Sequence, residues 1–290
     1  MDAVLLATLA GVLFGALAVA VRAGLRRAHD PEGGAFVTAS LGFLVVAAVA
    51  VPLAVVDGVE LGGLWAFALV GAIVPGLSQI VFVLAIRDAG ASRTAVVIGT
   101  APLLSAGLAL VFLDEPLRPA LAIATVAIVF GGALLVWERS RPPDFRAVGA
   151  VLALVAASLF AVRDNVVRWA SLDSGADPVL AAAVSLGAAA LALLAYLAAT
   201  HRARPVVARV RAALPAFAPA AVCLGLAYIA LLLAFSRGNV TVVAPLNATQ
   251  SLWGVLLAAT FLGRAEAVGP RLLLAAVLVV SGGVLIGATR

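Results

Sequence analysis

Ten stretches of about twenty mostly apolar residues follow one another along this chain, with only short polar breaks between them. A helix needs about 20 such residues to cross the roughly 30 Å hydrocarbon core of a bilayer. Strands of a membrane barrel would alternate polar and apolar residues, whereas these stretches are apolar on every side. The stretches cover residues 3–21, 35–56, 62–86, 94–113, 119–137, 147–168, 179–199, 213–235, 240–262 and 270–288. We therefore predict an all-α integral membrane protein with ten transmembrane helices.

The composition excludes a soluble fold, because 64% of the 290 residues are apolar and only 11% are charged. A soluble domain carries roughly 25% charged residues to cover its surface. The basic side chains are all arginine, and the chain is rich in alanine, valine and glycine, as in proteins from GC-rich prokaryotic genomes. We expect a multi-pass protein of a prokaryotic plasma membrane, with the lipid bilayer and no nucleic acid as partner.

The residues that are absent or rare exclude several kinds of chemistry. No lysine is present, so the chain has neither a Walker A motif nor a Schiff-base lysine. Cys223 is the single cysteine, and His29 and His201 both fall in polar breaks. We therefore expect no metal, no cofactor and no catalytic residue.

The two halves of the sequence resemble each other. Residues 84–113 align without a gap with residues 233–262, at an offset of 149. Phe14 and Arg22 match Phe160 and Arg168 at an offset of 146, and two glycine pairs match near the ends of the halves. Five spans per half is an odd number, so the second copy must be inverted in the membrane relative to the first. We predict two inverted five-helix repeats, residues 1–140 and 141–290, which is an architecture of secondary transporters.

Three segments of the first half resemble the EamA-like branch of the drug/metabolite transporter superfamily. They are residues 85–92, residues 101–103 and residues 112–117, which read AIRDAGAS, APL and FLDEPL. Residues 262–266 look like a stretched form of the same turn in the second half. Ala101 stands where this family usually has glutamate. The resemblance implies the ten-helix fold and a transport activity, and it does not select a substrate.

The arginines are distributed unevenly between the two sides of the predicted membrane. The loops after the odd-numbered spans carry 14 of the 19 arginines. The positive-inside rule places these loops in the cytoplasm and both termini outside. Family members usually have both termini inside, so the two arguments disagree, and we favour the charge count.

Polar residues inside spans are candidates for a binding site. They are energetically costly in a membrane, so those that are present usually have a function. In the ninth span, amide and hydroxyl side chains recur on one helix face, with Trp253 beside it and Gly254 leaving room for a ligand. Gln79 and Tyr228 occupy corresponding positions in the two halves. We predict a substrate site formed by Gln79, Tyr228, Asn247, Gln250, Ser251, Trp253 and Arg163. Hydrogen bonding between helices, or capping of a free carbonyl, is the alternative role for these side chains.

The sixth span ends with the sequence RDNVVR at residues 163–168. Asp164 and Arg168 are four residues apart and are expected to pair, which leaves Arg163 to point elsewhere. A self-neutralising helix end is one interpretation. In the other, Arg163 binds a carboxylate or phosphate and Asp164, the only carboxylate set so far into a span, carries a coupling proton.

Small residues and prolines inside the spans have simpler interpretations. Gly11 and Gly15, like Gly283 and Gly287, are spaced for close helix packing, and a homodimer surface is the alternative. Three prolines, Pro75, Pro102 and Pro245, are expected to kink their helices, either as hinges or as packing features.

These observations favour a secondary carrier over other classes of membrane protein. Amides, hydroxyls and one arginine suit a small polar metabolite, amino-acid-like, zwitterionic or anionic, and the expected direction is export. The first span has no ionisable residue, which argues against exchange of drug cations for protons. The alternative is a membrane-embedded enzyme or lipid-handling protein, disfavoured because no span holds a histidine or a glutamate for acid–base catalysis.

Overall fold

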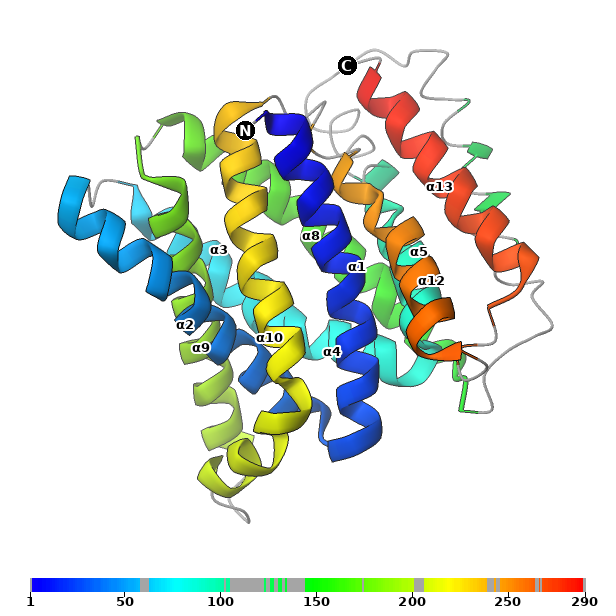
Figure 1. Ribbon diagram of the computed structural model, residues 1–290, viewed down its shortest axis with the longest axis horizontal. Coiled ribbons are helices and arrows are strands. Elements are labelled where there is room, and N and C mark those ends of the chain that lie inside the picture. Colours follow the sequence, from blue (N-terminus) through cyan, green and yellow to red (C-terminus); the bar gives the residue numbers. More distant parts are fainter. Residues whose placement is uncertain are drawn as a thin grey trace.

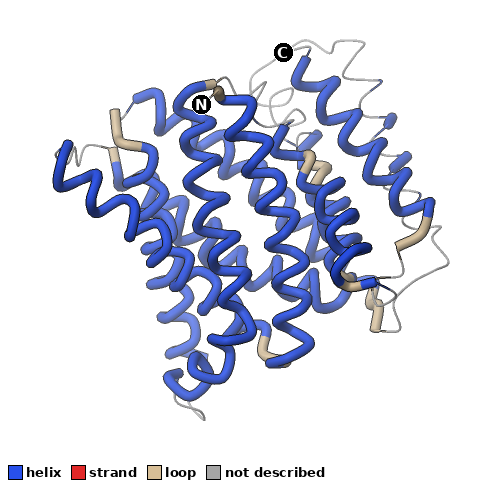
Figure 2. Tube along the Cα trace, viewed as in Figure 1, coloured by secondary structure: helices blue, strands red, loops and turns tan. Residues whose placement is uncertain are grey.

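The structure is a computed structural model in which every described element is a helix (Figures 1 and 2). It describes residues 2–57, 63–101, 103–104, 123, 126–127, 130–131, 134, 144–173, 175–200, 206–238, 243, 246–263, 266 and 268–288. The elements in the first half are α1 (Ala3–Ala28), α2 (Pro31–Asp57), α3 (Leu64–Gly71), η1 (Ala72–Leu77), α4 (Ser78–Ala89) and α5 (Ala91–Ile98). Those in the second half are α8 (Ala147–Asp173), α9 (Pro178–Thr200), α10 (Val206–Arg237), α12 (Gln250–Phe261) and α13 (Pro270–Ala288).

Within the described residues, six helical stretches are long and apolar enough to cross a membrane. They correspond to the predicted spans one, two, three, six, seven and eight, and α13 coincides with the tenth. The span predicted at 119–137 lies largely outside the described residues, as do the second part of 94–113 and the first part of 240–262. Helix α1 continues for seven residues beyond the predicted end at residue 21, because its last turns carry arginines that extend past the apolar stretch.

The chain turns in the same way after α1 and after α8. His29 and Gly175 both adopt left-handed backbone conformations, with φ of 53° and 62°. An aspartate then caps the next helix: Asp30 accepts from the backbone N–H of Gly33, and Asp177 accepts from Val179 and Leu180. A proline occupies the first position of both helices, α2 and α9, where its missing N–H costs nothing. The sequence comparison of the two halves thus has a structural counterpart in this turn.

The helices pack in pairs around the bundle (Figure 1). Helix α10 packs on α1 and α2, α2 packs on α9, α4 packs on α8, and α12 packs between α1 and α5. Helices α1 and α12 approach closely because Gly15 faces Gly254: a Cβ on Gly15 would lie 2.7 Å from the Gly254 nitrogen. The predicted packing role of Gly11 and Gly15 is confirmed, since Gly15 faces α12 and Gly11 faces the residues just before it, Leu246, Asn247 and Thr249. Gly283 and Gly287 belong to α13, and their surroundings are not described.

Several arginines lie at one end of the bundle, which we call the Arg-rich end. It is formed by the end of α1, the end of α4, and the starts of α8 and α10, with Arg22, Arg87, Arg146 and Arg209. Helix α1 ends there and α8 begins there, so the first helices of the two halves run in opposite directions. The starts of α1 and α10 lie at opposite ends, and the start of α1 lies at the same end as the end of α13 (Figure 1).

Candidate functional site

Two antiparallel helices, α4 and α8, bring Gln79 and Arg163 to one depth of the bundle. The Phe82 and Phe160 rings face each other with centroids 6.2 Å apart. Gln79 lies three residues before Phe82 and Arg163 lies three residues after Phe160, so both lie one turn further along on the same sides of their helices. The start of α8 also lies against the end of α4, since a Cβ on Gly149 would lie 2.5 Å from the Ala89 nitrogen. The two helices are therefore antiparallel. Both polar side chains lie near the middle of their membrane-spanning helices.

Arg163 is buried, with 4% of its surface exposed, and three aromatic rings surround its guanidinium. Its central carbon lies 4.9 Å from the centre of the Phe160 ring, 5.7 Å from that of Tyr228 and 5.8 Å from that of Phe14. Such distances allow cation–π attraction, which is strongest where water is excluded. The three rings belong to α8, α10 and α1, so Arg163 occupies a position shared by both halves of the chain.

The charge of Arg163 is balanced by its sequence neighbour Asp164. Arg163 Nε and Nη2 donate to Asp164 Oδ1 at 2.9 and 2.8 Å, and Nη1 donates to the Tyr228 hydroxyl at 3.4 Å. These contacts use three of the five N–H donors of a guanidinium. Two N–H donors of the Arg163 guanidinium therefore have no described partner, although the group lies among apolar side chains.

The predicted pairing of Asp164 with Arg168 is wrong. Arg168 instead donates to the carbonyl oxygen of Phe235 at 2.9 Å, on the neighbouring helix α10. The four-residue spacing gave the wrong partner because Asp164 binds Arg163 instead of Arg168. Arg163 itself is buried among the rings of Phe14, Phe160 and Tyr228. Arg168 corresponds to Arg22 in the first half, and Arg22 Nη1 lies 3.5 Å from the carbonyl oxygen of Ile86, the counterpart of Phe235.

Tyr228 lies at the depth of Phe14, because the two rings are in contact across the neighbouring helices α10 and α1. The Phe14 and Tyr228 rings meet edge to face with centroids 6.1 Å apart. Tyr228 is 1% exposed, and its hydroxyl accepts from Arg163. No described hydrogen bond joins Tyr228 to Gln79, its counterpart in the first half.

Asn247 and Gln250 reach the same depth along α1. A Cβ on Gly11 would lie 3.3 Å from the Asn247 carbonyl oxygen, and Gly11 is one turn from Phe14. That separation is about 4.5 Å along the helix axis. Gln250, half-buried, follows Asn247 by three residues in the parallel neighbour of α1. The structure therefore brings four predicted amide and hydroxyl residues into one layer with Arg163.

Ser251 and Gly254 serve helix packing in this structure. The Ser251 hydroxyl donates to the Ala248 carbonyl at 3.0 Å, and its side chain lies against Gly99. A Cβ on Gly254 would lie 2.5 Å from the Ala95 Cβ on α5, so the glycine admits a neighbouring helix rather than a ligand. Trp253 is half-buried and lies against Gly15. These three residues therefore contribute to helix packing next to the predicted site.

Two polar atoms of the layer are buried without a hydrogen-bond partner. They are Gln79 Nε2, a donor, and Asn247 Oδ1, an acceptor. Burying such a group unpaired costs about 1–3 kcal/mol, so native proteins keep few of them. Both atoms therefore indicate a site that a ligand or water completes.

The helix that carries Gln79 is interrupted just before it. Segment η1 separates α3 from α4, and Val74, with φ −137° and ψ 106°, leaves the helical conformation ahead of Pro75. The kink predicted at Pro75 is confirmed, whereas Pro102 and Pro245 lie outside the described residues. Ser78, which follows η1, also has an unpartnered buried hydroxyl. Broken helices at mid-membrane are a common way to expose backbone and side-chain polar groups to a transported solute.

Two of the three aromatic rings around Arg163, those of Phe14 and Phe160, were not predicted as part of the site. The sequence shows them only as matching positions of the two halves, because an apolar residue in a span gives no signal of its own. The correspondence of Phe14 and Phe160 between the two halves does have a structural meaning, because both rings pack on the Arg163 guanidinium.

A second buried arginine, Arg22, lies at the Arg-rich end and joins four segments. Its Nε donates to Glu266 Oε1 at 3.1 Å, Nη2 donates to Asp144 Oδ2 at 3.0 Å, and Nη1 donates to the Arg87 carbonyl at 2.9 Å. Glu266 is fully buried and also accepts from the Ser92 hydroxyl at 2.7 Å. The sequence motif containing Glu266 gave no hint that it meets α1, because the two are 244 residues apart.

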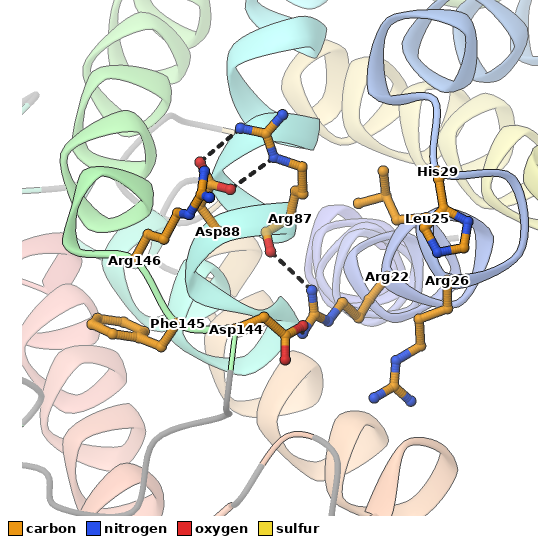
Figure 3. A pocket seen from close by; sticks show the side chains of 9 residues that line it. All are labelled: Arg22, Leu25, Arg26, His29, Arg87, Asp88, Asp144, Phe145 and Arg146. Carbon is orange, nitrogen blue, oxygen red and sulfur yellow. Dashed lines mark hydrogen bonds and ion pairs between the residues drawn. The ribbon is translucent and has the colours of Figure 1, made fainter.

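A cavity of about 610 Å³ opens beside Arg22 (Figure 3). Its lining consists of Arg22, Leu25, Arg26, His29, Arg87, Asp88, Asp144, Phe145 and Arg146. None of these was predicted as a site residue. Within the described residues, no group of three or more histidine, cysteine or acidic side chains is placed to hold a metal ion.

A bundle of membrane-spanning helices with a charged pair and unpaired amides at mid-depth defines a polytopic membrane protein with a buried polar layer. The profile of the EamA-like transporter family matches residues 1–137 and 147–288, so the chain belongs to this family of membrane transporters. The resemblance inferred from the sequence motifs is thereby confirmed. The fold is similar to a crystal structure described only as that of a protein, with 21% identity, a TM-score of 0.56 and coverage of 96% of each chain. No curated protein matches the sequence.

Proposed function

We propose that the protein is a secondary carrier that moves a small, amino-acid-like zwitterion or anion through the mid-depth layer by alternating access. The observation that carries this proposal is the buried unpaired donor Gln79 Nε2 and acceptor Asn247 Oδ1, at the depth of the Arg163–Asp164 pair. A carboxylate matches the guanidinium and the amide donor, and an ammonium matches the carboxylate and the amide acceptor. The three rings exclude water and strengthen these interactions.

The arrangement of the two halves supports alternating access. Helices α1 and α8 run in opposite directions, begin their turns in the same way, and both contribute a phenylalanine to the Arg163 environment. Two inverted halves of this kind can exchange conformations and open a central site to each side in turn.

The proposal is tested by solute counterflow with the full-length protein in liposomes. Liposomes loaded with an unlabelled amino acid should accumulate the labelled form, and Asn247→Leu should weaken apparent affinity because the solute loses a hydrogen bond. The matched control is Asn165→Leu, which removes an exposed amide from α8 close to the charged pair. Equal losses in the two variants, or turnover of a compound without movement across the membrane, would contradict the proposal.

We further propose that Asp164 carries the coupling proton and that export is the direction. Asp164→Asn should abolish transport driven by a proton gradient and leave solute exchange intact, because exchange needs no net proton movement. Cells with the wild-type protein should lose a labelled solute faster than cells with the variant. Normal gradient-driven transport by Asp164→Asn would reduce Asp164 to a partner of Arg163.

A further inference from the structure

Arg22 lies between the mid-depth layer and the cavity at the Arg-rich end. It lines the cavity (Figure 3), and it follows Phe14 by eight residues on α1, which corresponds to about 12 Å along the helix axis. Phe14 packs on the Arg163 guanidinium and therefore marks the depth of the layer. A solute that moves between the layer and the cavity has to pass the level of Arg22.

Arg22 also closes one end of the seam between α1 and α12. Gly15 and Arg22 are seven residues apart and therefore lie on the same face of α1. Gly15 packs on Gly254 of α12, and Arg22 Nε donates to Glu266 Oε1, in the turn that follows α12, at 3.1 Å. Since α1 belongs to the first half of the chain and Glu266 to the second, this ion pair joins the two halves at the Arg-rich end.

The fully buried carboxylate of Glu266 fits a space at the start of α5. Ser92 donates to Glu266 Oε2 through its hydroxyl at 2.7 Å and through its backbone N–H at 3.2 Å. Gly90, with φ of 90°, leaves room for this oxygen, because a Cβ there would lie 2.7 Å from it. The first turn of a helix also favours a negative charge. Glu266 is therefore held by α5 as well as by Arg22.

The corresponding arginine of the second half has different contacts. Arg168 follows Phe160 on α8 as Arg22 follows Phe14 on α1, and it donates to the Phe235 carbonyl at 2.9 Å. In the part of the chain that the structure describes, Arg168 forms no ion pair. If two inverted halves exchange conformations, the contacts that differ between their related positions are the ones expected to change.

We propose that the Arg22–Glu266 pair is a latch that holds the Arg-rich end closed and separates when the path between the layer and the cavity opens. The proposal rests on the alternating access proposed above, because only a carrier that opens at this end requires the pair to break. Each charge keeps a partner after the separation. Arg22 retains Asp144, whose side chain is 65% exposed on the cavity side, and Glu266 retains Ser92 and the start of α5. Neither charge is then left buried alone, which is the costly outcome when an ion pair breaks.

The test measures how fast a membrane-impermeant thiol reagent reaches the layer from each side. The probe is Gln79→Cys in the full-length protein with Cys223→Ala, which removes the one native cysteine. The protein is labelled in right-side-out and in inside-out membrane vesicles. A reference protein with Arg27→Cys, at the exposed end of α1, identifies the vesicles that present the Arg-rich end to the reagent. With the latch intact, position 79 should react slowly from that side.

Glu266→Gln should raise this labelling rate at least about tenfold, because it removes the charge that binds Arg22 and keeps an acceptor for Ser92. The rate from the opposite side should not rise, since the variant shifts a two-state equilibrium without loosening the bundle. Ser92→Ala keeps both charges and should give a smaller rise from the Arg-rich side, so it provides the same test if Glu266→Gln does not fold. The matched control is Asp144→Asn, which removes the other carboxylate bound to Arg22 and should leave the rate unchanged.

Three outcomes would overturn the latch. They are an unchanged rate from the Arg-rich side in Glu266→Gln, an equal rise in Asp144→Asn, and a rise from both sides, which would mean general loosening of the bundle. Labelling needs no transported solute. Absence of amino-acid counterflow would therefore reject the proposed solute, while the labelling rates still decide whether the pair is a latch.

Discussion

Two arginines of this protein, Arg22 and Arg163, are equally buried, with 4% of each exposed, and yet their surroundings differ in kind. Arg22 binds partners from three other segments of the chain: Glu266, Asp144 and the Arg87 carbonyl. Arg163 pairs with its own sequence neighbour, and around it lie aromatic rings.

The difference separates a structural role from a binding role. An arginine whose partners lie on several elements holds those elements together, and its removal leaves a buried carboxylate without its counter-charge. The ion pair of Arg163 with Asp164 lies within one helix and joins no other element, and the one side-chain hydrogen bond described from Arg163 to another helix is the long contact of 3.4 Å to the Tyr228 hydroxyl. The unpaired amide atoms of Gln79 and Asn247 lie at the depth of Arg163, whereas the acidic side chains that contact Arg22 are paired with it. Burial alone therefore does not distinguish the two arginines, whereas the origin of their partners supports the binding role that we propose for Arg163.

The largest effect is expected for Glu266→Ala, which should lower the free energy of unfolding by about 3–5 kcal/mol, as for other broken buried ion pairs. The variant removes the buried carboxylate that pairs with Arg22, while the exposed Asp144 remains, and it removes the acceptor of the Ser92 hydroxyl. Thermal unfolding in detergent measures the loss. Glu266→Gln should cost less, since its amide oxygen still accepts from Ser92. A wild-type unfolding temperature for Glu266→Ala would show that the Arg22 network is not structural.

Exchange of each arginine for lysine is the direct test of the comparison. Arg163→Lys should reduce substrate affinity by about 1.5–3 kcal/mol, the range for hydrogen bonds to charged groups, and leave stability nearly intact. Arg22→Lys should lower stability, because an ammonium cannot serve Glu266, Asp144 and the Arg87 carbonyl in the same planar geometry. Substrate affinity and unfolding temperature are measured for both variants. The comparison would fail if the two variants lost the same property.

A smaller effect is expected for Gln79→Leu. The unpaired Nε2 atom has no partner to lose in the substrate-free protein, so unfolding should be unchanged or slightly harder. Substrate affinity should fall by about 0.5–1.5 kcal/mol, the net value of one hydrogen bond. Thr38→Val is the control, since its buried hydroxyl already donates to the Gly34 carbonyl at 2.7 Å. Lost stability with normal affinity in Gln79→Leu would assign the amide to helix packing.

The smallest effect is expected for Asp144→Asn. Its side chain is 65% exposed, and an exposed ion pair contributes about 0–1 kcal/mol. Unfolding measured at low and high salt should show a small loss that salt removes. A loss as large as that of Glu266→Ala would mean that the Arg22 network depends on its exposed partner as much as on its buried one.

Hydrophobic length predicted the helices of this protein well, and helix periodicity predicted its charged contacts less well. The six long described helices and α13 lie where apolar stretches were found, because burying the backbone in lipid requires a helix whatever its neighbours are. The pairing of Asp164 was wrong because periodicity along one helix does not reveal a tyrosine and a phenylalanine on two others. The sequence singled out Gln79, Asn247 and Gln250 because polar residues are rare in spans, and their binding role stays a prediction. It singled out Ser251 for the same reason, and the structure shows its hydroxyl bonded to the Ala248 carbonyl.

The sequence by itself determined that the chain is a helical membrane protein of the EamA-like transporter family, since both conclusions depend on length, composition and local motifs. Only the tertiary structure decided which buried arginine joins several segments of the chain and which is surrounded by aromatic rings. The reason is separation along the chain: Arg22 and Glu266 are 244 residues apart, and Arg163 and Tyr228 are 65 apart. Contacts of that kind exist only once the helices have packed, and no periodicity within a single span records them.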